Sequence, residues 1–260
     1  GFKYFGDEYK VMGLAAYGKP IYYEKLKKIF FNKVNKDFKI NQSFLNIEGK
    51  DIKYRWRNKK LTSKDFFKEK YFINLLKIRK RKPNKKIEQK HIDLAASVQK
   101  LYEEFLFIIL KELNAKFKSK NLCFAGGCAM NSVANGKIKD FSRFKNIFIQ
   151  PASGDAGGAL GSALYINNKL NKSPKVRKNF NSYLGPSFSN DEIYEIIEKK
   201  LKKIKNKFKI IKFESKKLSE VIAKEIAKGA VVGFFHGKME WGARALGNRS
   251  ILCDPRNSNV

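Results

Sequence analysis

The residues whose types and spacing can do chemistry are concentrated in segment 236–256, which reads HGKMEWGARALGNRSILCDPR. Arg244 and Arg249 lie there among glycines. A guanidinium can bind phosphate through two parallel hydrogen bonds, and glycines leave the backbone open to a ligand. A surface salt-bridge cluster is the alternative, but the intervening residues are small or apolar. We therefore predict a phosphate or nucleotide site at Arg244 and Arg249, assisted by the neighbouring polar residues Lys238, Asn248 and Ser250.

A second candidate site is the glycine pair Gly126 and Gly127, followed by Asn131. Paired glycines let a backbone approach a ligand closely, and the amides at a helix N-terminus favour phosphate oxygens. Asn131 could then read a ribose or a base edge. A tight turn built from small residues for packing is the alternative, and the sequence leaves both open.

A third candidate is segment 153–159, SGDAGGA, which carries one acidic residue, Asp155, between Gly154 and Gly157. We expect this loop at the carboxyl end of a strand, where α/β proteins form their sites. A carboxylate there can bind a metal or position a metal-bound phosphate. The alternative is an aspartate that caps the following helix.

The elements that must position these residues follow from hydrophobic patterning. An apolar strand over 122–125 leads into a helix over 128–134, and a strand over 146–150 leads into a helix ending near 166. This repeated strand–turn–helix order predicts an α/β fold. The strongest helix is expected over 92–116, because apolar residues follow the 3.6-residue period at Leu94, Val98, Leu101, Phe105, Ile108 and Ile109.

The chain is expected to hold two modules, 1–168 and 181–260, joined by a polar Lys/Asn-rich linker over 167–181. Region 21–90 is Lys- and Asn-rich and is expected to be a peripheral insertion of short helices and loops. In the second module, Ser189 and Glu192 form a capping box that opens a helix. After it we expect a strand over 208–213, a helix over 218–228 that Gly229 ends, and a strand over 230–235.

Composition excludes several classes of protein. The 260 residues carry a net charge of +32, with 47 lysines and only 9 arginines, and 43% of them are apolar. This apolar content excludes a disordered polyelectrolyte, and no apolar run approaches the ~18 residues of a membrane helix. Three cysteines and two histidines are too few for a disulfide framework or a self-contained zinc site. We ascribe the lysine excess to compositional bias and expect a cytoplasmic protein without a membrane or specific nucleic-acid partner.

Four segments carry a resemblance to a known family: 12–18, 93–99, the two glycine segments 126–131 and 153–161, and 183–186 continuing to 237–256. In them the chain resembles the O-carbamoyltransferases of antibiotic and nodulation-factor biosynthesis. The resemblance implies the C-terminal part of an actin-like ATPase-fold module, followed by the start of a second α/β module similar to the threonylcarbamoyl-AMP synthases. Because the chain opens at Gly1 and stops at Val260, we expect a fragment that is inactive alone.

The resemblance also implies a reaction. The family makes carbamoyl-adenylate from carbamoyl phosphate and ATP, and transfers the carbamoyl group to a hydroxyl of a small-molecule or sugar-containing acceptor. Asp155 is similar to the family's metal ligand, with iron as the implied metal, and the family's histidine ligands are expected upstream of this chain. The chain departs from the family pattern where Lys238 replaces an arginine, Trp241 a phenylalanine and Ala243 a proline.

Two other functions remain open from the sequence. The first module also resembles the tRNA threonylcarbamoyladenosine-modifying ATPases, although the fused second module disfavours that reading. A non-enzymatic protein that binds polyanions is favoured only by the net charge. It would require the lysines to form one face and not a diffuse coat.

Overall fold

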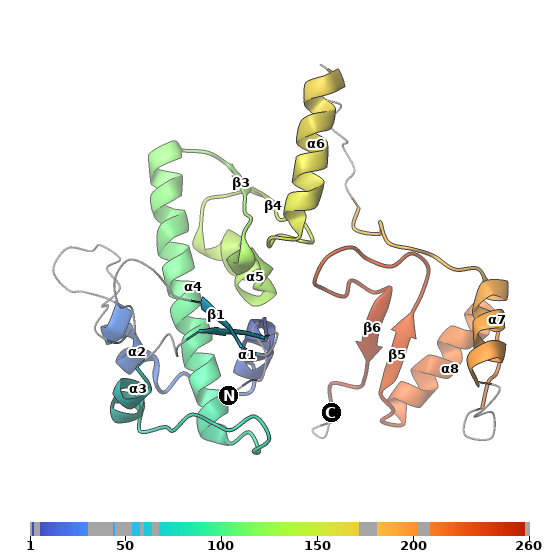
Figure 1. The fold of residues 1–260 in the computed structure, drawn as a ribbon, viewed down its shortest axis with the longest axis horizontal. Coiled ribbons are helices and arrows are strands. Elements are labelled where there is room, and N and C mark those ends of the chain that lie inside the picture. The colour runs from blue at the N-terminus through green and yellow to red at the C-terminus, as the bar shows by residue number, and fades with distance from the viewer. Residues whose placement is uncertain are drawn as a thin grey trace. The chain divides into compact units, whose positions relative to one another are not determined.

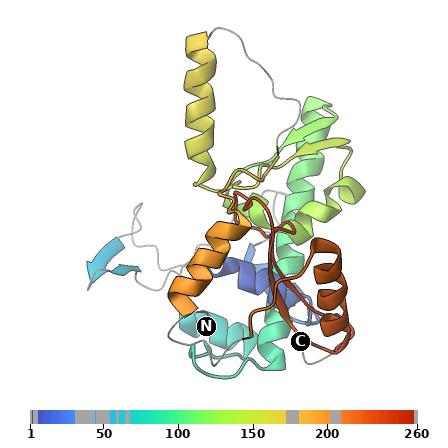
Figure 2. The same cartoon turned by 90° about the vertical axis from the view of Figure 1, so that its right-hand side faces the viewer.

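A computed structural model describes residues 2, 6–30, 44, 54–57, 60–63, 68–171, 181–201 and 209–257 (Figures 1 and 2). The chain divides into two compact units. Unit 1 comprises Gly1–Leu122 and Asn131–Ile147, and unit 2 comprises Cys123–Met130 and Phe148–Val260. The predicted module boundary near 168–181 stays a prediction, because this division follows compactness and falls elsewhere in the chain.

Unit 1 is built around one long helix, α4 (Gln89–Phe117), which confirms the helix predicted over 92–116. Helices α1 (Glu8–Ala15) and α2 (Tyr23–Phe30) pack against α4 (Figure 1). The predicted insertion contains α2, helix α3 (Glu69–Leu76) and a hairpin that the sequence analysis missed. Its strands are β1 (Tyr54–Arg57) and β2 (Lys60–Ser63), which pair antiparallel. Apart from residues 21, 22 and 44, the rest of region 21–67 lies outside the described residues.

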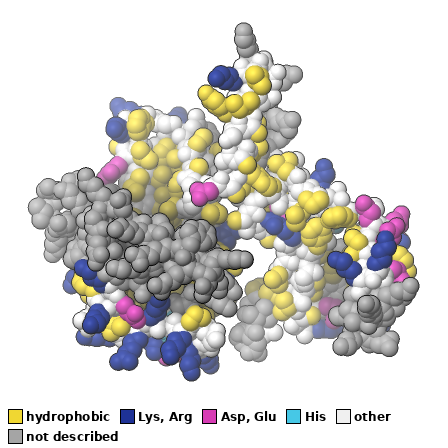
Figure 3. Space-filling view, viewed as in Figure 1, with side chains coloured by type: hydrophobic (Ala, Val, Ile, Leu, Met, Phe, Trp, Pro, Cys, Tyr) yellow, Lys and Arg dark blue, Asp and Glu magenta, His cyan; other side chains and the backbone are white. Residues whose placement is uncertain are grey.

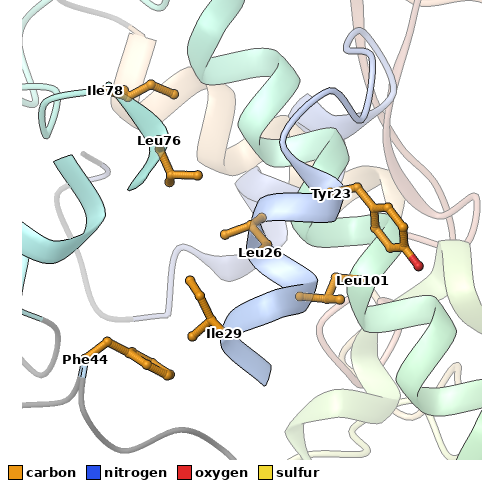
Figure 4. Close-up of a cluster of buried hydrophobic side chains, with 7 residues drawn as sticks. All are labelled: Tyr23, Leu26, Ile29, Phe44, Leu76, Ile78 and Leu101. Carbon is orange, nitrogen blue, oxygen red and sulfur yellow. The ribbon is translucent and has the colours of Figure 1, made fainter. Parts of the chain in front are cut away.

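The core of unit 1 lies where α2, α3 and α4 meet (Figure 4). Leu101 of the predicted stripe is buried there, but Val98 and Ile109 are 41% and 43% exposed. Burial on α4 therefore does not follow this apolar period alone, since Ala95, Leu106 and Phe107 are also buried. Its Phe107 stacks on Phe141 of α5 (Ser132–Phe141), with ring centroids 4.5 Å apart. The core cluster comprises Tyr23, Leu26, Ile29, Phe44, Leu76, Ile78 and Leu101.

Both strands predicted around the glycine segments exist, although they are shorter than predicted. Strands β3 (Asn121–Cys123) and β4 (Asn146–Phe148) form a two-stranded sheet. The helix predicted over 128–134 is confirmed only from Ser132, where α5 begins; a 3₁₀ turn, Gly127–Met130, comes first. The prediction failed before Ser132 because Asn131 ends one element and caps the next. Helix α6 (Gly157–Asn171) runs past 166, so the first residues of the predicted linker are helical.

Unit 2 ends in helices α7 (Asn190–Leu201) and α8 (Ser215–Ala227) and strands β5 (Val232–Phe235) and β6 (Arg249–Leu252). The predicted capping box is confirmed, because Glu192 N donates to Ser189 Oγ (3.2 Å) and Ser189 N donates to Glu192 Oε2 (2.7 Å). The strand predicted over 208–213 is wrong for 209–213, which form no strand, and residue 208 lies outside the described residues. Strand β6 was not predicted. It pairs antiparallel with β5, and Phe235 lies opposite Arg249.

Helices and two-stranded sheets together make a mixed α/β structure, which agrees with the predicted class. The actin-like arrangement of the first module stays a prediction. None of the described helices combines the length and the apolar composition that a membrane crossing needs.

Candidate functional site

The segment that joins β5 to β6, residues 236–248, folds as a closed loop, which we call the signature loop. Its two ends are tied together, because His236 N donates to Asn248 O (2.8 Å) and Asn248 Nδ2 donates to Lys238 O (2.7 Å). A second segment holds it from outside: Trp241 N donates to Ser182 O (2.6 Å). Lys238 itself is exposed. The loop therefore has a fixed backbone course that positions the polar residues predicted from the sequence.

A buried acid, Glu240, lies at the centre of the signature loop and is only 2% exposed. Its Oε1 accepts hydrogen bonds from the backbone N–H groups of Leu246 (2.8 Å), Asn248 (2.7 Å) and Arg249 (3.3 Å). Its Oε2 accepts one from Arg249 Nε (3.2 Å). Burial on its own raises the pKa of a carboxyl group, but these donors outweigh it and hold the pKa of Glu240 at about 2. Glu240 is therefore an anion at neutral pH.

The two arginines predicted to hold phosphate both donate to protein atoms. Arg249 Nη2 donates to the carbonyl oxygens of Gly242 (2.6 Å) and Arg244 (3.3 Å), in addition to its contact with Glu240. Arg244 Nη2 donates to Met130 O (2.7 Å). Ser250 lies beside Arg249 in β6 and pairs with Phe234 across the ladder. Arg249 thus forms part of the frame of the loop, and the phosphate contacts of both arginines stay a prediction.

Unit 2 brings three of the predicted segments together. Gly126 N donates to Ser153 O (2.7 Å), which joins the turn that carries Gly126 and Gly127 to the turn that precedes α6. Gly242 of the signature loop approaches the second turn so closely that a Cβ there would lie 2.5 Å from Pro151 O. Arg244 reaches the first turn through Met130 O (2.7 Å). Gly154 lies in the second turn, and Gly157 begins α6.

Asp155 lies in the second turn and is exposed, and its carbonyl oxygen accepts a hydrogen bond from Gly158 N (2.9 Å). A common non-haem iron site has three protein ligands, two histidines and one carboxylate. Within the described ranges, no group of three or more His, Cys, Asp or Glu residues could hold a metal ion. The described residues therefore do not complete the predicted metal site.

Asn131, predicted to read a nucleotide, has a structural position in unit 1. Its Oδ1 accepts a hydrogen bond from Ala134 N (3.0 Å), so that it caps α5. Its amide also exchanges two hydrogen bonds with Gln99 of α4, at 2.8 and 3.1 Å. The side chain thus joins two helices, which the sequence analysis did not predict. A role in nucleotide binding stays a prediction.

Unit 1 also contains a cavity of about 700 Å³ between α1, α3 and α4. It is lined mainly by apolar side chains such as Leu14, Phe72, Leu94 and Phe105. None of the predicted site residues lines it. The cavity is therefore separate from the chemistry that the sequence predicts.

Positive charge is distributed unevenly on the face that Figure 3 shows. In Figure 3, Lys and Arg side chains are scattered over the visible face and gather at the lower edge of unit 1, over α3 and the segment after it. That segment contains the basic run Arg79–Lys80–Arg81–Lys82. The scattered lysines fit the diffuse coat expected from compositional bias, and the basic run is a local exception to it.

Glu240 was not among the site residues predicted from the sequence. A signal was present, because Glu240 is the one acidic residue between the arginine-bearing strand β6 and α8, and it stands between Met239 and Trp241. An acid flanked by large apolar residues is expected to be buried and therefore to need donors. Its partners could not be named from the sequence, since they depend on the course of the loop.

Comparison with known families identifies the class of protein. A family model described as carbamoyltransferase N-terminus matches residues 1–164, and one described as carbamoyltransferase C-terminus matches residues 223–260. The chain therefore belongs to the carbamoyltransferase family, as the sequence motifs indicated.

Several individual proteins are similar to the chain, and one of them is named as a carbamoyltransferase. An uncharacterized protein of Synechocystis sp. is 38% identical over all of this chain and 40% of its own length. Nodulation protein NolNO of Sinorhizobium fredii is 35% identical, over 98% of this chain and 34% of its own length. The 3'-hydroxymethylcephem-O-carbamoyltransferase of Streptomyces clavuligerus is 28% identical, over 67% of this chain and 30% of its own length. The chain thus spans 40% or less of the length of these relatives.

Proposed function

We propose that the protein containing this chain transfers a carbamoyl group to a hydroxyl of a small-molecule or sugar-containing acceptor. Membership of the family supports the reaction class, and the name of the Streptomyces relative states such a transfer. The proposed donor is carbamoyl phosphate, which water cleaves to carbamate and phosphate. A carbamate oxygen then attacks the α-phosphorus of ATP, so that pyrophosphate leaves and carbamoyl-adenylate forms. The acceptor oxygen then attacks the carbamoyl carbon, and AMP leaves with the electron pair of the broken C–O bond.

The proposed roles of the residues follow from their positions. The backbones at Gly126, Gly127, Gly154 and Gly157 would lie along the nucleotide, because glycine turns admit a phosphate chain closely. Arg244, assisted by Lys238, Asn248 and Ser250, would bind phosphate oxygens, and Arg249 would hold the loop in place beside them. Asp155 would supply one metal ligand, and its partners would come from parts of the protein outside the described residues.

One observation supports this proposal above the others: the signature loop and the two glycine turns meet within unit 2. The meeting point is marked by the contact of Arg244 Nη2 with Met130 O (2.7 Å). Backbone amides and guanidinium groups that face the same ligand can together bind its phosphates. The sequence places these groups more than a hundred residues apart, and the fold brings them into contact.

The test is ATP–pyrophosphate exchange that depends on carbamoyl phosphate, in a full-length family member that carries these residues. A fork contact with a charged group contributes about 1.5–3 kcal/mol, so Arg244→Ala should weaken substrate binding about ten- to a hundred-fold. Arg244→Lys should recover only part of the loss, because lysine restores the charge without the fork. Arg256→Ala is the matched control, since the Arg256 side chain is 83% exposed and pairs with Asp254.

The outcomes distinguish a role of the signature loop in adenylation from a general effect of surface charge. If Arg244→Ala and Arg244→Lys both exchange at the wild-type rate and with unchanged substrate dependence, the signature loop is not the adenylation site. If Arg256→Ala loses as much activity as Arg244→Ala, the effect is one of general surface charge. Arg249→Ala is expected to lose exchange as well, but indirectly, because the loop loses the side-chain hydrogen bonds that Arg249 makes to its backbone and to Glu240.

A further inference from the structure

The hydrogen bonds around Glu240 have the form of an anion-binding nest. Three backbone N–H groups, those of Leu246, Asn248 and Arg249, point at one carboxylate oxygen over 2.7–3.3 Å. A guanidinium nitrogen, Arg249 Nε, lies 3.2 Å from the other oxygen. Converging backbone amides with an arginine beside them form the kind of concavity in which proteins bind phosphates and carboxylates. Here the anion is a side chain of the same loop.

We propose that the signature loop is organised around this internal anion, and that Glu240 is the positioning residue for Arg249 and for the loop segment that carries Arg244. The carboxylate fills the nest, so this nest is not a place for a substrate phosphate. Any phosphate that the loop binds must lie at its outer groups. The inference rests on the geometry of the loop and not on the proposed carbamoyl transfer, so its test requires no turnover.

The connection from Glu240 to the rest of the loop runs through Arg249. The guanidinium is fixed by Glu240 at Nε, and its Nη2 then reaches the carbonyl oxygens of Gly242 (2.6 Å) and Arg244 (3.3 Å). Removal of the carboxylate leaves three amides and a guanidinium without their common acceptor, which is costly for buried donors. The loop is then expected to open, and Arg249 is expected to release the two carbonyls.

A neutral residue of the same shape does not replace the acid. In Glu240→Gln, one side-chain oxygen can still accept from the backbone amides, but the new NH₂ group is a donor and faces the Arg249 Nε donor. In Glu240→Ala, a small carboxylate from solution can take the place of the missing side-chain carboxylate, because that variant keeps the nest and leaves the space that the side chain occupied. Rescue by added formate or acetate therefore distinguishes an anion site from ordinary packing.

The 260-residue chain contains its own reporter for this loop. Trp241 adjoins Glu240, and the other tryptophan of the chain is Trp56. In a Trp56→Phe background, the emission maximum and the acrylamide quenching of Trp241 report the order of the loop. Trypsin cleavage after Arg244, followed by mass spectrometry, is a second readout. Glu225→Ala is the matched control, because Glu225 is about half exposed and pairs with Lys228, three residues further along the chain, at 2.7 Å.

We expect Glu240→Ala to shift the emission of Trp241 to longer wavelength, to raise its quenching and to speed cleavage after Arg244. Formate or acetate should reverse all three changes at constant ionic strength, whereas chloride should not, and the wild type and Glu225→Ala should not respond. Glu240→Gln should show the same loosening without unfolding of the helices in circular dichroism.

Three results would overturn the proposal. The first is a Glu240→Ala loop that keeps the wild-type emission and cleavage rate. The second is a loosened Glu240→Ala loop that responds equally to chloride and to carboxylates, or to neither. If Glu240→Ala unfolds the whole chain, Glu240→Gln decides, and wild-type loop behaviour in that variant shows that the negative charge is not required.

Discussion

Unit 1 and unit 2 both use a carboxylate to hold an irregular segment, but they place it in different surroundings. In unit 1, Asp93 of α4 accepts hydrogen bonds from Lys19 N (2.8 Å) and Gln89 Nε2 (2.9 Å), which holds segment 16–22 against the helix. The core cluster around Leu26 and Leu101 lies beside it. In unit 2, the buried apolar side chains among the described residues are those of Ala129 and Ala152 only.

This difference indicates which interactions stabilise segment 16–22 in unit 1 and the signature loop in unit 2. In unit 1 the carboxylate adds to packing that apolar burial already stabilises. In unit 2 the signature loop has little apolar burial of its own, so its order depends on the hydrogen bonds to Glu240 and on close backbone contacts. Damage to the apolar core should therefore affect unit 1 most, and damage to polar or backbone contacts should affect the signature loop most.

The largest expected effect is in the core of unit 1. Leu101→Ala removes a side chain that is 5% exposed and should cost about 2–5 kcal/mol. The measurement is the opening free energy of α4 in native-state hydrogen exchange with mass spectrometry. Leu113→Ala on the same helix is the control, because Leu113 is 38% exposed and should cost far less. Equal losses in the two variants would show that the core does not stabilise this helix selectively.

The second prediction concerns the backbone of the signature loop. Gly242 has a φ of +118° and has no room for a Cβ beside Pro151 O. Gly242→Ala should therefore destabilise the loop by about 1–3 kcal/mol. Gly161→Ala in α6 is the control, since the site is open and helical, and alanine should stabilise it by about 0.5–1 kcal/mol. Both are measured by urea unfolding followed at Trp241. A stable Gly242→Ala variant would contradict the close approach to Pro151.

The third prediction tests a buried polar contact in unit 1. Ser97 is fully buried; its Oγ accepts from Tyr22 N (3.0 Å) and donates to Asp93 O (2.7 Å). Ser97→Ala leaves the Tyr22 amide without its acceptor and should cost about 1 kcal/mol. Ser219→Ala is the control: it has the same bond to the carbonyl four residues back (3.2 Å), but it is exposed. Ser97→Ala should lower the midpoint of thermal unfolding more than Ser219→Ala does. Identical unfolding of the two variants would show that Ser97 does not help to hold segment 16–22 against α4.

The smallest effect is expected on acidification and should be confined to the signature loop. The pKa of Glu240 is lowered from 4.5 to about 2, so its stabilising contacts are fully present above pH 4.5 and are lost as the pH falls towards 2. Emission of Trp241 should shift over that window in the Trp56→Phe background. Asp254, whose pKa is also about 2 because of Arg256, titrates in the same window. Glu240→Gln separates the two: it should abolish the shift, and a shift that persists would assign it to Asp254.

Local signals in the sequence predicted the elements whose stability is local. The period of α4, the capping box of Ser189 and Glu192, and the glycine stop at Gly229 after α8 each depend on neighbours a few residues apart. These three helices were therefore predicted in the segments where the structure has them. The strand over 208–213 was predicted on apolar content alone, without a partner strand, and the structure has no strand there over the described residues.

The site was less predictable, because its contacts join distant segments. The sequence indicated that Arg244 and Arg249 belong to a glycine-rich loop with a ligand site. It did not indicate that Arg249 would bind Glu240 or that Arg244 would reach Met130. Asn131 carried two signals, a glycine turn before it and a helix after it, and its cap position follows from the second. Such outcomes depend on the paths of loops, which residue types alone do not determine.

The ladder between β5 and β6 has a consequence for insertions and deletions in this protein. Phe235 lies opposite Arg249, and successive residues of a strand point to opposite faces. A slip of one residue in β6 would put Ser250 where Arg249 now stands and would turn the guanidinium away from Glu240. Changes of length should therefore be tolerated poorly within 237–248. Changes of side chain at exposed loop positions that have no proposed phosphate contact, such as Ala245, should be tolerated far better.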